Sequence, residues 1–515
     1  MAPPLPGNAT AEPPRLSAWR LAAFASPITP VTIAFLPLVL LIPGFYAQDM
    51  GLDVAAVGGA LLFARLIDAF SDPLVGALSD RTRSRFGRRR PWIVAGVPVL
   101  MVAVWLLFLP SGKPTLVYLY SCIIVVYIGW TLVFIPHQAW GAELQRGFEG
   151  RNRLNVYMGL FNACGVFTCL ALPFLVLSPL ARPIKEALFG WALDGDTIMP
   201  AAFVRTLEFS GAGRVPFTEI MGILAVLILV LLPLSVIACL SAVREVPVAP
   251  APITWRSAID VFRRNKPFAH MVIGGAFLQV SVQLWTAAQP FYLSTVLGLP
   301  DAFLLLLIIN QAFAILTVPT WGWIARRLGR ARGLALAGAA MIAGFAILFA
   351  VPYGELAPTI VAYLFLGAAS DGKWMLPIAL AADTADYDEW KTGRKEAGVH
   401  LSMLFLTNKL GIAAGGLTLI AFGIFGYQPG RPDNSESALL AVKYISTVVP
   451  IVCSAIGMAI LWRFRIGTRT HEAIRRRLAR RQAAATAAVA PDGPMRSQPS
   501  RAGTSASDAP VGSVQ

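Results

Sequence analysis

Two aspartates stand out because they lie inside an apolar stretch of the chain. Asp68 and Asp72 are four residues apart, so a helix would place both carboxylates on one face. A carboxylate at membrane depth costs about 2.5 to 3.5 kcal/mol, and two on one face repel each other unless a cation or proton lies between them. With Thr131 they could form an oxygen cage for Na⁺ or Li⁺; alternatively, one aspartate could carry a proton. The structural alternative is pairing with arginine. Arg65 lies one turn from Asp68 and is also a candidate substrate-binding or coupling residue.

Three more residues within apolar runs could carry chemistry. Asp371 and Lys373, with Trp374 beside them, form a candidate substrate or coupling site, and the alternative is a local ion pair that makes insertion tolerable. Lys409 lies more than two turns inside another apolar run. It could neutralise the aspartates when they are empty, which would link cation occupancy to conformation, whereas snorkelling to the interface is the alternative.

A dense basic cluster follows the aspartates, with six arginines between residues 81 and 90. Such a cluster cannot cross a bilayer and indicates the cytoplasmic surface. We expect a cytoplasmic gate here, in which the two later aspartates pair with arginines of this connection or of the one near residues 146–153; the alternative is a positive anchor only. The residues expected at the gate are Asp80, Arg81, Arg88, Asp383, Asp386 and Arg394.

Composition sets the class of protein. The 515 residues are 56% hydrophobic and 14% charged, and the mean hydropathy is +0.64, which is typical of a polytopic membrane protein. The net charge of +15 does not indicate nucleic acid, because the arginines lie between apolar runs and in the C-terminal tail, where they orient the chain and attract anionic lipid. The sequence has no Walker A loop, HExxH motif or nucleophile elbow, so we expect neither an enzyme nor a cofactor.

The spacing of apolar runs predicts an all-α protein with twelve transmembrane helices in two six-helix bundles, since each run is about 20 residues long. The runs are 20–47, 55–79, 91–110, 115–141, 154–178, 217–241, 268–294, 302–324, 333–352, 357–382, 398–426 and 438–462. Basic residues concentrate in the even-numbered connections, which predicts that both termini are cytoplasmic.

The same pattern predicts the domain organisation. Residues 1–19 form a disordered cytoplasmic leader, 20–241 the N-terminal bundle, 242–267 a cytoplasmic linker, and 268–462 the C-terminal bundle. The tail, 463–515, is first basic and then disordered. Parallel six-helix halves predict a substrate cavity between them, near the bilayer midplane.

Three blocks of the sequence resemble the glycoside–pentoside–hexuronide:cation symporter family, the melibiose-permease-like branch of the major facilitator superfamily. The blocks are Arg65 to Pro73 followed by Thr82 to Gly87, Asp383 to Gly393, and Lys409 to Gly411. The resemblance implies alternating access driven by Na⁺, Li⁺ or H⁺. It also implies that Asp68, Asp72 and Thr131 form the cation site and that Trp374 is an aromatic platform for a sugar.

The chain departs from the sugar-transporting members at three places. Phe134 stands where they carry a charged residue, Met158 stands where they carry a sugar-binding arginine, and the first span has no ionisable group. A polyol needs polar groups to replace its bonds to water, so these departures weaken the case for a sugar. Lysophospholipid symporters share the architecture, and their amphiphilic cargo would suit an apolar cavity.

We therefore expect a cation-coupled (Na⁺ or H⁺) secondary symporter of the plasma (inner) membrane, carrying a glycoside, sugar or sugar acid. The first alternative is a cation-coupled transporter of an amphiphile such as a lysophospholipid. The second is a transport-inactive membrane sensor or scaffold, against which the buried titratable groups argue. The expected partners are a small-molecule substrate and the lipid bilayer, with no nucleic acid and no obligatory protein partner.

Overall fold

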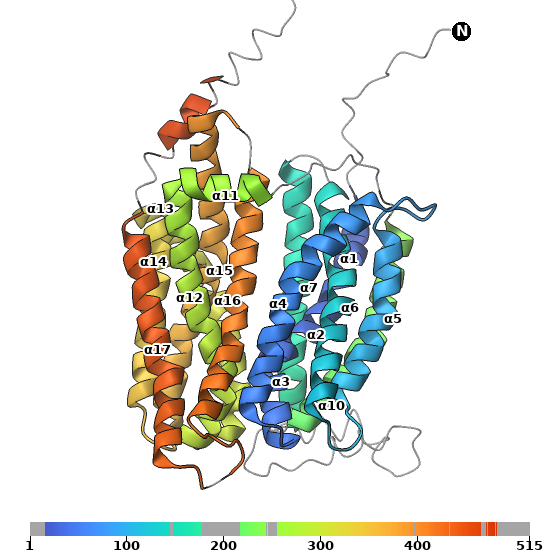
Figure 1. The fold of residues 1–515 in the computed structure, drawn as a ribbon. Helices are drawn as coiled ribbons and strands as arrows, with labels where there is room; N and C mark the ends of the chain where they lie inside the picture. Colours follow the sequence, from blue (N-terminus) through green and yellow to red (C-terminus); the bar gives the residue numbers. More distant parts are fainter. Residues whose placement is uncertain are drawn as a thin grey trace, which may run out of the picture.

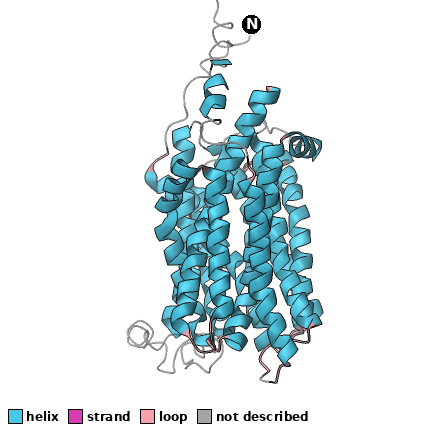
Figure 2. Cartoon of the chain, turned by 90° about the vertical axis from the view of Figure 1, so that its left-hand side faces the viewer, coloured by secondary structure: helices cyan, strands magenta, loops and turns pink. Residues whose placement is uncertain are grey.

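The computed structural model describes residues 16–144, 148–177, 217–243, 245, 255–394, 397–431, 433–464, 470, 472–478 and 480–481. These residues form helices joined by short connections, and no strand occurs among them (Figure 2). The long helices run side by side in two groups, and α4 and α16 face each other where the groups meet (Figure 1).

The first group carries the chain from its N-terminal side to residue 242. It comprises α1 (Ala18–Ala25), α2 (Ile28–Leu40), α3 (Ile42–Gly44), the π-helical turn η1 (Phe45–Asp49), α4 (Val54–Arg81), α5 (Arg90–Phe108), α6 (Leu116–Leu144), α7 (Phe148–Leu177) and α10 (Phe217–Ala242). The second comprises α11 (Trp255–Arg264), α12 (Lys266–Phe291), the π-helical turn η3 (Tyr292–Val296), the 3₁₀ turn η4 (Pro300–Ala302), α13 (Phe303–Leu328), α14 (Arg330–Ala350), α15 (Leu356–Thr392), α16 (Ala397–Ile424) and α17 (Glu436–Trp462).

Eleven helical stretches in the described part of the chain are long and apolar enough to cross a membrane. The remaining expected span is α15, which has 37 residues but carries Asp371 and Lys373 within its apolar run, and these lower its hydropathy. It packs against α12, α13, α14 and α16 like the other spans. The predicted all-α, polytopic fold is confirmed. The domain boundaries stay predictions, and residues 1–15, 246–254 and 482–515 lie outside the described residues.

The two groups repeat one local structure at the end of their first long helix. In each group the first span leads into a π-helical turn, η1 or η3. Two residues after the turn comes a glycine with positive φ, Gly51 at 71° or Gly298 at 65°. Within the turns, the hydroxyl of Tyr46 donates to Leu107 O at 2.8 Å, and that of Tyr292 donates to Leu348 O at 2.7 Å. Both acceptors lie at the end of the third span of their group, so the chain contains a structural duplication.

Two helices that carry candidate site residues begin at side-chain caps. Asp53 Oδ1 accepts a hydrogen bond from Ala56 N at 2.8 Å at the start of α4, and Asn265 Oδ1 accepts one from Phe268 N at 3.1 Å at the start of α12. Each cap satisfies a backbone donor that the first helical turn leaves free.

Glycines allow α4 and α16 to touch at the backbone. A Cβ at Gly416 would meet Gly58 O at 2.5 Å, a Cβ at Gly58 would meet Gly416 O at 2.5 Å, and a Cβ at Gly423 would meet Ala55 Cβ at 2.4 Å. We call Ala55, Gly58, Gly416 and Gly423 the glycine seam. Because Gly416 lies about two turns from Lys409, the seam fixes where the lysine meets α4.

Candidate functional site

Lys409 of α16 reaches across to the two aspartates of α4. Its Nζ donates to Asp68 Oδ2 at 3.0 Å and to Asp72 Oδ2. From α6, the hydroxyl of Thr131 donates to Asp72 Oδ1 at 3.0 Å and lies 3.4 Å from Asp68 Oδ1. Asp68 is fully buried, with 1% of its side chain exposed, against 12% for Asp72 and 22% for Lys409.

Arg65 completes this cluster from the preceding turn of α4. Its NH1 lies 3.7 Å from Asp68 Oδ2, and its guanidinium lies between the rings of Phe35 and Tyr127, at 4.8 and 4.6 Å from their centroids. The charges of Arg65 and Lys409 therefore balance those of the two aspartates. We call Arg65, Asp68, Asp72, Thr131 and Lys409 the charged cluster.

Aromatic side chains border the charged cluster on the α6 side. Trp130 stacks on Phe134 with ring centroids 4.3 Å apart, and Lys409 Nζ lies 5.8 Å from the centroid of Trp130. Three buried donor atoms here have no hydrogen-bond partner among the described residues: Arg65 NH2, Tyr127 Oη and Trp130 Nε1. Phe134 thus packs beside the cluster and adds no charge to it.

The chemistry of this arrangement suits a small cation as well as the lysine ammonium. The Lys409 ammonium lies between two carboxylates, where Na⁺ or a proton would neutralise the same negative charge. Carboxylate and hydroxyl oxygens are hard ligands that suit an alkali cation. In the part of the chain that the structure describes, no group of three or more His, Cys, Asp or Glu residues could hold a metal ion.

The α15 candidates lie on a different helix and have different surroundings. Lys373 Nζ donates to Gln279 Oε1 of α12 at 2.6 Å. The Oδ2 atom of Asp371 is buried, and no group in the described parts of the chain bonds to it. The local Asp371–Lys373 ion pair that the sequence left open does not form, because residues two apart point to different sides of a helix. Trp374 is 54% exposed, and its role as an aromatic platform stays a prediction.

A cavity of about 160 Å³ is lined by residues of both helix groups. Leucines and valines of α2 and α7 form its apolar side, and α12, α13 and α15 supply amide and hydroxyl groups. Gln289 Oε1 accepts a hydrogen bond from the Tyr363 hydroxyl at 3.2 Å, and Asn310 Nδ2 donates to Tyr363 O at 3.3 Å. The sequence indicated an apolar cavity and missed these amides, although Gln289, Asn310 and Gln311 are visible inside apolar runs.

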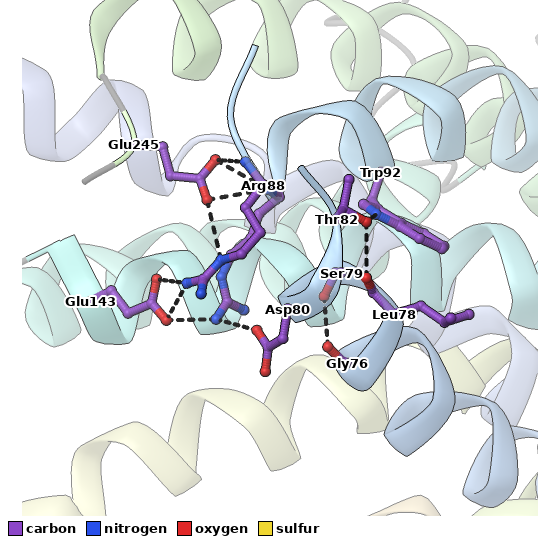
Figure 3. A network of polar contacts seen from close by, with 10 residues as sticks. Gly76, Leu78, Ser79, Asp80, Thr82, Arg88, Trp92, Glu143 and Glu245 are labelled. Carbon is purple, nitrogen blue, oxygen red and sulfur yellow. Dashed lines mark hydrogen bonds and ion pairs between the residues drawn. The ribbon is translucent and has the colours of Figure 1, made fainter. Parts of the chain in front are cut away.

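A second polar network lies where α4 ends and α5 begins (Figure 3). Arg88 NH2 donates to both oxygens of Glu143 at 2.8 Å, and Arg89 NH2 donates to Glu143 at 2.6 Å and to Asp80 at 2.8 Å. The backbone N–H groups of Arg88 and Arg89 donate to the Glu245 carboxylate at distances from 2.9 to 3.2 Å, a favourable place for a negative charge at the N-terminus of α5.

The gate residues predicted from the sequence fall into separate contacts. Asp80 pairs with Arg89, and Arg81, the other expected gate residue beside it, is exposed. Asp383 pairs with Arg330 at the start of α14, and Arg394 lies 3.7 Å from Asp260.

Part of the gate prediction remains open. Asp386 is half-buried in α15, and its predicted pairing with the basic connections, like the predicted cross-pairing of Asp383, stays a prediction. Arg146 and the side chain of Arg151 lie outside the described residues. The sequence did not single out Glu143, Arg89 or Glu245, and an acidic residue at the end of an apolar run, as Glu143 is, was the available signal.

The chain matches the family model described as MFS/sugar transport protein over residues 23–468. It therefore belongs to this family of membrane transporters, which are not enzymes, and the resemblance predicted from the three sequence blocks is confirmed. A solved structure, that of a bacterial homologue of the human lysosomal transporter Spinster in an inward-facing, unoccupied conformation, aligns with a TM-score of 0.59 at 14% identity. The alignment covers 89% of this chain and 99% of that one and shows a shared fold.

Two named relatives differ in the cargo that their names state. The glucuronide carrier protein homolog of Escherichia coli is 25% identical over 438 residues, covering 83% of this chain and 88% of the relative. The sodium-dependent lysophosphatidylcholine symporter 1 of Xenopus tropicalis is 22% identical over 434 residues, covering 81% of this chain and 82% of the relative.

Proposed function

We propose that this chain is a cation-coupled secondary symporter that works by alternating access. The observation that carries the proposal is the position of Lys409, whose ammonium bonds to both Asp68 and Asp72. A protein with only a structural role has no need for four ionisable groups at membrane depth, where each is costly. The same argument disfavours a transport-inactive sensor or scaffold.

The coupling cation and Lys409 compete for the same carboxylates. When Na⁺ or a proton neutralises Asp68 and Asp72, the attraction that holds α16 to α4 at this depth weakens, because the lysine loses its partners. A ligand shifts a conformational equilibrium only by its different affinity for the two states. The lysine supplies that difference, since it competes with the cation only in the conformation that brings α4 and α16 together.

The substrate is a glycoside, sugar or sugar acid in our first proposal, and an amphiphile such as a lysophospholipid in our second. The similarity to the glucuronide carrier homologue supports the first proposal, and the similarity to the lysophosphatidylcholine symporter supports the second. The amide groups of the cavity favour hydroxyl-bearing ligands, whereas its apolar α2 and α7 side suits an amphiphile. Residues 20–241 and 268–462 would move against each other about the 242–267 linker, in the plasma (inner) membrane, with both termini in the cytoplasm.

Uptake by reconstituted protein tests the proposal. Proteoliposomes would be given imposed Na⁺ or H⁺ gradients and a panel of labelled sugars, sugar acids and lysolipids. We expect at least one substrate to accumulate in the wild type, and Asp72→Asn and Asp68→Asn to abolish accumulation while leaving some downhill exchange. Asp433→Asn, in an exposed connection, is the matched control. Accumulation by the Asp68→Asn/Asp72→Asn double variant at the wild-type level would overturn the proposed cation site.

A further inference from the structure

Lys373 is a membrane-depth cation without an acidic partner. Among the described residues, no carboxylate lies within ion-pair distance of its Nζ, and its one hydrogen bond goes to the neutral amide of Gln279, which is 95% buried. Lys409, by contrast, bonds to two aspartates. A charge at membrane depth with only an amide partner is costly, and an anion brought by a ligand would relieve that cost.

The position of Lys373 relates it to the cavity between the helix groups. Ala369 and Ser370 of α15 line the cavity, and Lys373 follows them by about one turn. On α12, Val282 lines the cavity and Gln279 precedes it by about one turn. Because α12 and α15 run in opposite directions and the two side chains bond to each other, both lie at the same end of the cavity.

The cavity has an apolar side and a polar side, which suits an amphipathic ligand. Leu36 and Leu170 lie on its apolar side, whereas Gln289, Asn310 and Gln311 present amides on the other. No hydrogen-bond partner of the Gln311 amide occurs in the described residues. The volume of the cavity, about 160 Å³, is smaller than the ~300–1,000 Å³ of typical small-molecule sites. It has room for the head of a ligand.

We propose that Lys373 is the anion-recognising residue of the substrate site, and that the cavity binds the head of an amphipathic anion whose carboxylate or phosphate displaces Gln279 from the ammonium. This assignment rests on the proposed transport function and names the substrate class within it. A lysine is a compact point charge that suits either anion, so a sugar acid and a lysophospholipid are two sources of the same chemistry.

Displacement of Gln279 would change its contact with α16. The side chain of Gln279 presses against Gly411, where a Cβ would lie 2.4 Å from Gln279 Cγ. Gly411 is two residues after Lys409, so the amide connects the anion-recognising lysine with the helix that carries the coupling lysine. Substrate binding would thus reach the charged cluster through one side chain.

Matched ligand pairs test the assignment on the full-length protein in phosphatidylcholine nanodiscs. Calorimetric titration would compare 4-nitrophenyl glucuronide with 4-nitrophenyl glucoside, and lysophosphatidic acid with the monoacylglycerol of the same chain length. We expect the anion of at least one pair to bind about tenfold or more tightly than its neutral twin, as for a hydrogen bond to a charged group. The pair that shows the preference identifies the source of the anion.

Variants at Lys373 give the decisive comparison. Lys373→Gln should remove the preference for the anion over its neutral twin, and Lys373→Arg should keep it. Lys113→Gln, in an exposed connection, should behave like the wild type. Equal binding of both twins by the wild type, no binding of either anion, or a preference that survives in Lys373→Gln would overturn the inference. Cation-dependent stabilisation that requires Asp72 tests the proposed function separately, so the two can fail independently.

Discussion

At the scale of single residues, Lys409 has the clearest consequence for coupling. Replacing it with Gln removes one positive charge from between Asp68 and Asp72 and leaves Arg65 alone to balance them. We expect the affinity for the coupling cation to rise by about tenfold, the equivalent of ~1.4 kcal/mol, because the competitor is gone. The measurement is the Na⁺ concentration, and separately the pH, that gives half-maximal stabilisation in thermal melts.

Lys113→Gln is the control for Lys409→Gln, because it removes a lysine outside the charged cluster. It should leave both midpoints where they are in the wild type. If Lys409→Gln also left the Na⁺ and proton midpoints unchanged, then Lys409 would not compete with the coupling cation.

Glu143 is the residue on which the network of Figure 3 depends, because it accepts from both Arg88 and Arg89. Glu143→Gln should destabilise the protein by about 1.5 to 3 kcal/mol, the usual range for hydrogen bonds to a charged group. Asp260→Asn is the matched control, because Asp260 is 57% exposed and exposed ion pairs contribute at most about 1 kcal/mol. Equal losses of melting temperature in the two variants would contradict this prediction.

At the scale of helices, the glycine seam holds α4 against α16. Gly416→Ala should cost about 1 to 3 kcal/mol, because the added methyl would meet Gly58 O and Leu62 N, both backbone atoms, at 2.5 and 2.9 Å. The same substitution at Gly275 of α12 meets nothing within 4 Å and should be neutral or stabilising by up to ~1 kcal/mol. Thermal melting of the two variants checks the difference, and a Gly416→Ala variant as stable as Gly275→Ala would refute a tight seam.

The helices were more predictable than the contacts between them. Apolar runs gave the spans, since length and hydropathy decide what crosses a bilayer, and the two aspartates were recognisable because their cost at that depth demands a reason. The pairing of Arg89 with Asp80 and Glu143 was not predictable. It depends on how α4, α5 and α6 pack, and no local pattern encodes which of six neighbouring arginines turns inward.

The cavity shows the same limit. The sequence suggested that polar groups had been lost, because charged positions known from sugar symporters were apolar here. The structure brings amides of α12 and α13 to the cavity instead, and separate helices must fold before those side chains share a space. Lys373 was identified as a candidate from its depth, whereas its partner Gln279 lies 94 residues earlier in the chain.

At the scale of the whole molecule, charge decides orientation. The connection between α4 and α5 and the start of α14 are rich in arginine, whereas the turn between α5 and α6 contains a single lysine, Lys113. Positive segments stay on the cytoplasmic side during insertion. Green fluorescent protein fused after Arg481 should therefore fluoresce, and alkaline phosphatase fused there should be inactive. Fusions at Gly112 should give the reverse. Active phosphatase at Arg481 would show that the topology is the reverse of the predicted one, with the network of Figure 3 on the outer side of the membrane.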